Sequence, residues 1–180
     1  MRWKSEAHRY GAVAVTIHWT TALAIFGLLA SGLAMGRLND AGKTDLLRVH
    51  AIVGVSVLVL TLLRIAWWAF ADRRPGDVSG QPRWQAAAAW AVHRLLYVVI
   101  IVMGISGIAM IALTGAGTIL FGGEAGPLPS FHAVPPRAAH GTGYLVLSAL
   151  IALHIGAALY HQFVRSDRLL GRMGIGAAPR

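Results

Sequence analysis

The chain contains no cysteine among its 180 residues, and only 13% of its residues are charged. Without cysteine there is no disulfide, no thiolate haem ligand, no iron–sulfur cluster and no covalent haem attachment through a C-x-x-C-H motif. The charged fraction is about half of the roughly 25% typical of soluble domains. Hydrophobic residues make up 56% of the chain. Because they are gathered into long runs, the composition predicts an integral membrane protein.

Acidic residues are also scarce, since seven Asp and Glu stand against sixteen Lys and Arg, a net charge of +9. Such an excess often indicates a nucleic-acid partner. Here the basic residues lie at the ends of the apolar runs, as membrane topology requires. We therefore expect no nucleic-acid partner, and the predicted surroundings are a lipid bilayer.

Four apolar runs, residues 12–35, 49–70, 86–113 and 141–163, each match or exceed the roughly 20 residues of a spanning helix. The first exceeds the about 7–15 residues of a signal-peptide core, so we expect it to be retained. No internal repeat is apparent. The predicted fold is one domain over residues 1–180, an all-α membrane protein whose four helices form an up-and-down bundle. The long, apolar connection between the third and fourth helices is expected to lie on the outer membrane surface.

Basic residues that flank the runs predict the orientation of the chain. On the side of the two termini there are ten: Arg2, Lys4, Arg9, Arg73, Arg74, Arg83, Arg165, Arg168, Arg172 and Arg180. On the opposite side there are four: Arg37, Lys43, Arg48 and Arg137. This excess predicts that both termini are cytoplasmic.

The fourth run carries three histidines, His140, His154 and His161, spaced by 14 and 7 residues. These spacings are close to four and two helical turns, so the three imidazoles lie on one stripe of the helix. His140 and His154 are then roughly 21 Å apart along the axis. This is most of a hydrocarbon core of about 30 Å. The pattern predicts two metal or haem sites stacked through the bilayer, with hydrogen bonding to neighbouring helices as the structural alternative.

The other runs carry partner histidines at matching depths. In an up-and-down bundle, His18 lies near His154 on the inner side, and His50 lies near His140 on the outer side. Zinc is the competing metal, but a structural zinc ion needs four ligands at one point. Arg64 follows His50 by 14 residues, so it either pairs with a haem propionate or snorkels to the inner surface. About one turn from each of the four histidines there is a small residue that leaves room for a flat macrocycle: Ala22, Gly54, Gly143 and Ala158.

Two further histidines, His93 and His161, lie near the inner membrane surface. They either form polar walls of a second pocket or pack at the level of the lipid headgroups. A redox chain beside lipid needs an electron acceptor, and membrane quinone is the obvious one. A histidine can hydrogen-bond to a quinone carbonyl and supply protons when the quinone is reduced. His8 and His132 lie in the flanking segments and are expected to be solvated.

The fourth run with its tail, HGTGYLVLSALIALHIGAALYHQFVRSDRLLGRM, resembles the bacterial cytochrome b-561 family, close to the superoxide oxidases. IHW in the first run, VHAIVG in the second and HRLLYVVIIVMGISG in the third are similar as well. The resemblance implies an inner-membrane protein with two haem b groups, held by His18 and His154 and by His50 and His140. It also implies a ubiquinone site at His93 and His161.

The activity that the resemblance implies is oxidation of superoxide to dioxygen, with the electrons passed to ubiquinone. The main alternative is a membrane-anchor cytochrome b subunit that relays electrons between a partner dehydrogenase or hydrogenase and quinone. A second alternative is a haem-free transporter or structural bundle. Arg48 and Arg137 flank the outer histidines and would steer superoxide, an anion, toward them. Alternatively, they bind haem propionates or lipid headgroups.

Overall fold

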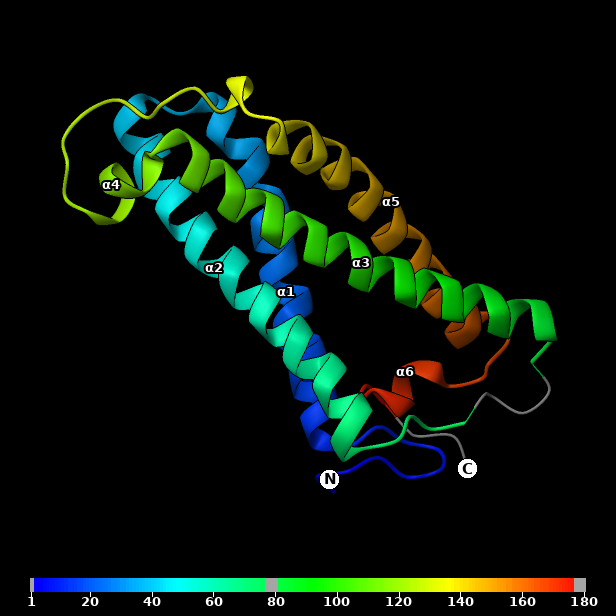
Figure 1. Cartoon of the computed structure of the whole chain (residues 1–180). Coiled ribbons are helices and arrows are strands. Elements are labelled where there is room, and N and C mark those ends of the chain that lie inside the picture. The colour runs from blue at the N-terminus through cyan, green and yellow to red at the C-terminus, as the bar shows by residue number, and fades with distance from the viewer. Residues whose placement is uncertain (1, 77–80, 177–180) are drawn as a thin grey trace. The chain divides into compact units, whose positions relative to one another are not determined.

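The computed structural model describes residues 2–76 and 81–176, which are almost entirely helical and contain no strand. Four long helices carry most of these residues: α1 (Ala12–Ala34), α2 (Asp40–Ala66), α3 (Arg83–Thr114) and α5 (Pro136–Phe163). The short helices α4 (Ala116–Phe121) and α6 (Leu169–Arg172) precede and follow α5 (Figure 1). With the turns that continue α1 and α2, the four long helices are each long and apolar enough to cross a membrane. The prediction of four apolar helices is confirmed.

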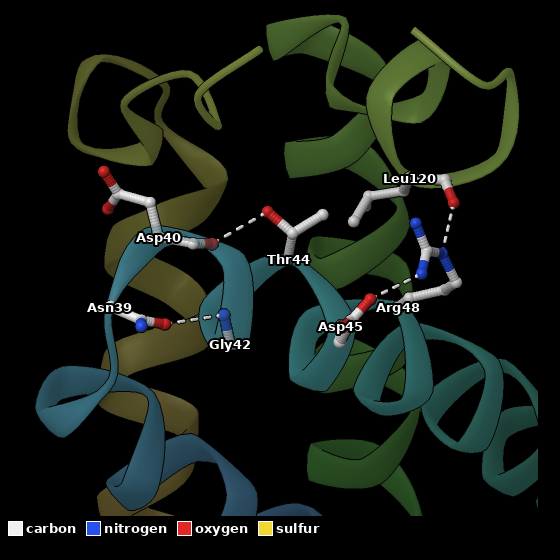
Figure 2. Close-up of polar contacts among 7 residues, drawn as sticks. All are labelled: Asn39, Asp40, Gly42, Thr44, Asp45, Arg48 and Leu120. Carbon is white, nitrogen blue, oxygen red and sulfur yellow. Dashed lines mark hydrogen bonds and ion pairs between the residues drawn. The ribbon is translucent and has the colours of Figure 1, made fainter. Parts of the chain in front are cut away.

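Helix α2 begins nine residues before the predicted start at residue 49 because a polar turn extends it. Asn39 caps this turn, and its side-chain oxygen accepts a hydrogen bond of 2.9 Å from the backbone N–H of Gly42 (Figure 2). Asp40 follows in the first turn, where a negative charge is favourable at the helix N-terminus. The apolar run therefore marks the membrane segment and not the full length of the helix.

The other helix ends show the same difference between the apolar run and the hydrogen-bonded helix. Helix α5 starts at Pro136, five residues before the apolar run, since proline is well suited to the first turn of a helix. Helix α3 begins at Arg83, three residues before its apolar run. At its far end α2 continues into a wider turn, Trp67–Ala71, which closes with a hydrogen bond of 3.0 Å from Asp72 N to Trp67 O.

The described chain falls into two compact units. Unit 1 comprises Met1–Thr20, Leu62–Val98 and Leu147–Arg180, and unit 2 comprises Thr21–Thr61 and Val99–Val146. Each long helix contributes one end to each unit, so the chain passes from unit 1 to unit 2 along α1, returns along α2, and repeats this along α3 and α5. Arg180, one of the ten basic residues that predict the orientation, lies outside the described residues.

Unit 1 ties the N-terminal segment to two other parts of the chain. The Asp72 carboxylate accepts hydrogen bonds from the Ser5 N–H (3.0 Å) and hydroxyl (2.8 Å). The buried Arg172 donates from Nη2 to Gly76 O at 2.6 Å, and its own carbonyl accepts a 3.1 Å bond from Tyr10 N. Burial alone would raise the pKa of Asp72, but the hydrogen bonds from Ser5 outweigh this effect and hold that pKa below its ordinary value.

Unit 2 contains the apolar connection between α3 and α5. In this connection, which we expect to lie on the outer membrane surface, Ala116 and Leu120 are buried within the unit. Arg48 fixes the segment because its Nε donates a 2.6 Å hydrogen bond to the carbonyl of Leu120 (Figure 2). The segment is therefore partly a packed element of the fold, held by a side chain of α2.

Large apolar side chains are exposed along all four long helices, for example Leu23, Val59, Val98 and Leu153. A soluble protein rarely exposes so much apolar surface without a partner for it. Lipid tails are the natural solvent for such faces. The small set of buried apolar side chains and the large exposed set are therefore both consistent with helices that lie in a bilayer.

Candidate functional site

In unit 2, His50 of α2 and His140 of α5 face each other with ring centroids 6.4 Å apart and planes inclined by 59°. A metal ion between two imidazoles needs metal–nitrogen bonds of about 2.0–2.1 Å, and about 1.1 Å more separates each nitrogen from its ring centroid. The centroids would then be about 6.3 Å apart. The observed separation of 6.4 Å would therefore let both imidazoles hold one metal ion.

Each of these histidines contacts a serine on the neighbouring helix. His50 Nδ1 lies 2.7 Å from Ser31 Oγ, and His140 Nδ1 lies 3.0 Å from Ser106 Oγ. The Ser31 hydroxyl also bonds to the Leu28 carbonyl at 3.0 Å, and Ser106 bonds to the carbonyl three residues before it at 3.1 Å.

These serines favour one ring nitrogen as the site of the proton. A hydroxyl has one proton, which Ser31 and Ser106 can give to the backbone carbonyl. When they do, the serine oxygen accepts a hydrogen bond from the imidazole, and Nδ1 of His50 and of His140 carries the N–H. Nε2 keeps its lone pair, which is the form that ligates a metal, with the second hydrogen bond fixing the tautomer and the ring orientation.

The space near His140 differs at two glycines, Gly107 and Gly143. A Cβ added to Gly107 would lie 3.4 Å from His140 Cε1, so glycine leaves the imidazole free of a neighbouring side chain. At Gly143, by contrast, an added Cβ would lie 2.5 Å from Met103 Sδ. The space expected there for a macrocycle is thus filled by the end of a flexible methionine, which moves at little cost.

Sequence reasoning missed Ser31 and Ser106, although a signal was present. His18 is followed after 13 residues by Ser31-Gly-Leu-Ala-Met, and His93 is followed after 13 residues by Ser106-Gly-Ile-Ala-Met. In the other two helices, His50 precedes Arg64 by 14 residues, as His140 precedes His154. Helices α1 and α3 thus share a short motif, a histidine followed after 13 residues by Ser-Gly-Leu/Ile-Ala-Met.

In unit 1, His18 of α1 and His154 of α5 have ring centroids 6.2 Å apart, with planes inclined by 71°. This separation would also let both imidazoles hold one metal ion. His93 of α3 lies closer to His154, at 5.1 Å and in an edge-to-face contact. A separation of 5.1 Å is too short for an iron between His93 and His154. The geometry favours His18 as the partner of His154 and makes His93 a packing neighbour of that ring.

Arg64 lies in the same cluster and carries a buried polar atom without a partner. It shares a side-chain hydrogen bond with Tyr97, while its Nε is buried and has no hydrogen-bond partner. The charged and polar groups that interact with it include two tyrosines, one arginine and three histidines, and no carboxylate of the described residues is among them: Tyr97, Tyr10, Arg74, His18, His93 and His154. Since a buried cation is costly without an anion, the site suits an acidic group from outside the chain, such as a haem propionate.

Of the two arginines expected to flank the outer histidines, Arg48 is already engaged. Its Nη1 forms a 2.8 Å ion pair with Asp45, in addition to the bond from Nε to Leu120 (Figure 2). Arg137 instead lines an open cavity of about 670 Å³ at the start of α5, together with His132. His132 and His8 are exposed, as expected. Arg137 is therefore better placed than Arg48 to meet an anion from solution.

The two histidines expected at an inner pocket have different neighbours. His93 contacts His154, as described above. His161 is buried near the end of α5, where its Nδ1 lies 2.6 Å from an Asp167 carboxylate oxygen and its ring contacts Tyr160. Burial alone would raise the pKa of Asp167, but hydrogen bonds from His161 and Arg165 outweigh burial and hold that pKa below its ordinary value.

Comparison with known proteins gives a consistent result along nearly the whole chain. The model of the family described as prokaryotic cytochrome b561 matches residues 9–176. Cytochrome b561 homolog 1 of Escherichia coli is 29% identical over 177 residues, covering 92% of this chain and 97% of the relative. Cytochrome b561 homolog 2 of the same organism is 26% identical over 96% of this chain and 95% of its own length. Cytochrome b562 of Cereibacter sphaeroides is 30% identical over 91% of this chain and 94% of its own length.

Proposed function

Because the chain belongs to the prokaryotic cytochrome b561 family, a family of multi-pass bacterial membrane cytochromes that bind b-type haem and transfer electrons, we propose that it is an inner-membrane dihaem cytochrome b that oxidises superoxide and reduces ubiquinone. In this proposal both termini are cytoplasmic, as the excess of basic residues on their side favours. The superoxide reaction takes place at the outer face, and ubiquinone is reduced at the inner face.

The observation that carries the proposal is the pair of imidazole separations, 6.4 Å for His50 with His140 and 6.2 Å for His18 with His154. Each separation would let both imidazoles hold the iron of one haem. In unit 2, Ser31 and Ser106 further support this role because they leave the Nε2 lone pairs of His50 and His140 free for a metal. In unit 1, the unpartnered Nε of Arg64 would bind a propionate.

His18 with His154 and His50 with His140 would each hold one haem b, which would supply one-electron transfer. The residues of the chain would therefore orient the haem, shield it from solvent and balance its charge. The reactant would not bind to the metal. Superoxide would give up its electron at the edge of the site in unit 2, with Arg137 as a positive charge that lines an open cavity there. Two superoxide anions leave as two dioxygen molecules, and ubiquinone takes up the two electrons with two protons to form ubiquinol.

Haem stoichiometry tests the four proposed ligands. Pyridine haemochrome analysis of the purified protein is expected to give two b-type haems per chain. His18→Ala and His154→Ala should each remove one haem, and His50→Ala and His140→Ala should each remove the other. His93→Ala is the matched control, because His93 contacts His154 but is too near to share an iron with it. Fewer than two haems in the parent protein, or loss of a haem in His93→Ala, would contradict the assignment.

The reaction itself is tested with the purified protein, a superoxide source and a soluble ubiquinone analogue. Stoichiometric loss of superoxide and formation of quinol by the protein alone supports the proposal. If the protein holds two haems but reduces quinone only when it is fed by a partner enzyme, it is instead an anchor subunit that relays electrons between that partner and quinone.

A further inference from the structure

The chain folds back after α5 so that Asp167 returns to His161. Val164 and Arg165 both donate backbone hydrogen bonds to the Tyr160 carbonyl, and Asp167 N donates to the carbonyl of His161 at 3.0 Å. The backbone takes left-handed conformations at Ser166 (φ 57°) and Arg168 (φ 52°). Such conformations are costly for residues other than glycine and persist only where the surroundings enforce them. The turn thus uses strained backbone to bring a carboxylate to an imidazole.

The contact that results is short and shielded from water. His161 Nδ1 and Asp167 Oδ2 are 2.6 Å apart, and the two side chains are only 10% and 13% exposed. Arg165 Nε adds a second bond to the same carboxylate oxygen at 3.2 Å. With two donors on one oxygen, the carboxylate remains ionised, as its lowered pKa also indicates. An ionised carboxylate only accepts hydrogen bonds, so Nδ1 of His161 must carry a proton.

Because the carboxylate holds Nδ1, Nε2 is the ring nitrogen of His161 that is left for a second hydrogen bond. Neutral His161 can accept a hydrogen bond at Nε2, and protonated His161 can donate one there. Without the carboxylate, the ring would be free to place its single proton on either nitrogen. An acid that donates a proton within a reaction needs both a fixed ring and a fixed tautomer.

We propose that Asp167 is a positioning residue that holds His161 with Nε2 as its donor atom, for hydrogen bonding and proton transfer to the carbonyl oxygen of a bound quinone. This inference rests on the proposed function, because it assigns the proton supply of the same quinone reduction. In the step, the Nε2–H bond breaks, the proton joins the reduced quinone oxygen, and the electrons come from the haem chain. His161 then regains its proton from water.

A carboxylate that only stabilises the turn after α5 would make the same contacts. The test therefore compares two carboxylates of unit 1. Asp167→Asn keeps the shape of the side chain but removes its charge, and its amide can donate to Nδ1. Asp72→Asn is the matched control, because Asp72 also has a lowered pKa and several hydrogen bonds, which it accepts from Ser5. Both are tested in the intact haem-loaded protein.

The first readout is the oxidation of prereduced haem after rapid mixing with a soluble quinone. Asp167→Asn is expected to slow this step by about tenfold or more and to raise its solvent isotope effect, while Asp72→Asn leaves both unchanged. The second readout, ¹⁵N resonance of histidine-labelled protein, should show His161 protonated at Nδ1 in the parent and shifted toward the Nε2–H tautomer in Asp167→Asn. Asp167→Glu, which keeps the charge, should retain the parent tautomer and recover part of the rate.

The outcomes separate this inference from the proposed function. If the parent protein fails to reduce quinone, the proposed function fails and this inference fails with it, whatever the ¹⁵N spectrum shows. If the parent reduces quinone but Asp167→Asn has the same rate and the same tautomer, Asp167 has only a structural role and the inference is wrong. A loss of haem in Asp167→Asn and in Asp167→Glu alike would also assign Asp167 a structural role.

Discussion

Ser106 Oγ lies 3.0 Å from Nδ1 of His140 while it donates its own proton to a backbone carbonyl of α3. Ser31 repeats this relationship with His50. Both serines precede a Gly-Leu/Ile-Ala-Met sequence, in α1 and in α3. Each histidine of unit 2 thus contacts a serine from the same short sequence motif.

Replacing either serine is expected to weaken haem binding in unit 2. Ser31→Ala and Ser106→Ala remove the partner that fixes the imidazole tautomer, and partners of this kind typically contribute about 10- to 100-fold in metal affinity. Haem titration of the apoprotein measures the change. Ser56→Ala is the control, since the Ser56 hydroxyl bonds to its own helix at the Ile52 carbonyl. Equal haem affinity in all three variants would show that the serines do not orient the ligands.

Arg64→Gln is expected to lower the midpoint potential of one haem. A buried positive charge favours the more negative, reduced form, so its removal should lower the potential by roughly 50 mV. A spectroscopic redox titration resolves the two haems. Arg94→Gln is the matched control, because Arg94 stacks on Trp90 at 3.8 Å within the same unit. Unchanged potentials in Arg64→Gln would indicate that Arg64 snorkels to the membrane surface.

Charge changes near the start of α2 and α5 should alter the superoxide rate in opposite directions. Arg137→Gln removes a cation that lines an open cavity, so the second-order rate should fall by about two- to threefold. Asp45→Asn frees Arg48 from its ion pair, so the rate should rise. Both effects should shrink as the ionic strength increases. Rates that are insensitive to salt and to both substitutions would contradict steering and favour a protein donor.

The stability of unit 1 should fall in acid because of Asp72. Its folded-state pKa is lower than the ordinary value, since the hydrogen bonds from Ser5 outweigh the effect of burial. Folding therefore favours the ionised form, and this contribution is complete above about pH 4 and is lost as the pH falls through the folded pKa. Thermal unfolding in detergent between pH 6 and pH 3 should show a smaller loss of stability in Asp72→Asn than in the parent. Parallel curves for the two proteins would contradict this contribution.

The sequence alone determined the number of long helices and the stretches of chain that form them. An apolar run of about 20 residues in a polar chain has few alternatives to a membrane helix. It also predicted His18 with His154 and His50 with His140 as candidate pairs, because helical spacing relates depth to residue number. As haem ligands these four residues remain predictions. Local patterns missed the polar first turn of α2, since its start depends on the Asn39 cap rather than on hydropathy.

Tertiary structure alone decided which polar side chains meet. Hydropathy does not distinguish a helix face that packs on protein from one that meets lipid, because both are apolar. It therefore could not place Ser31 against His50, or His93 against His154. The contact of Asp167 with His161 needed the left-handed backbone of Ser166 between them, which a serine does not signal in sequence. The spacing along one helix is fixed by its geometry, whereas contacts between segments depend on rotation and packing that only the folded chain determines.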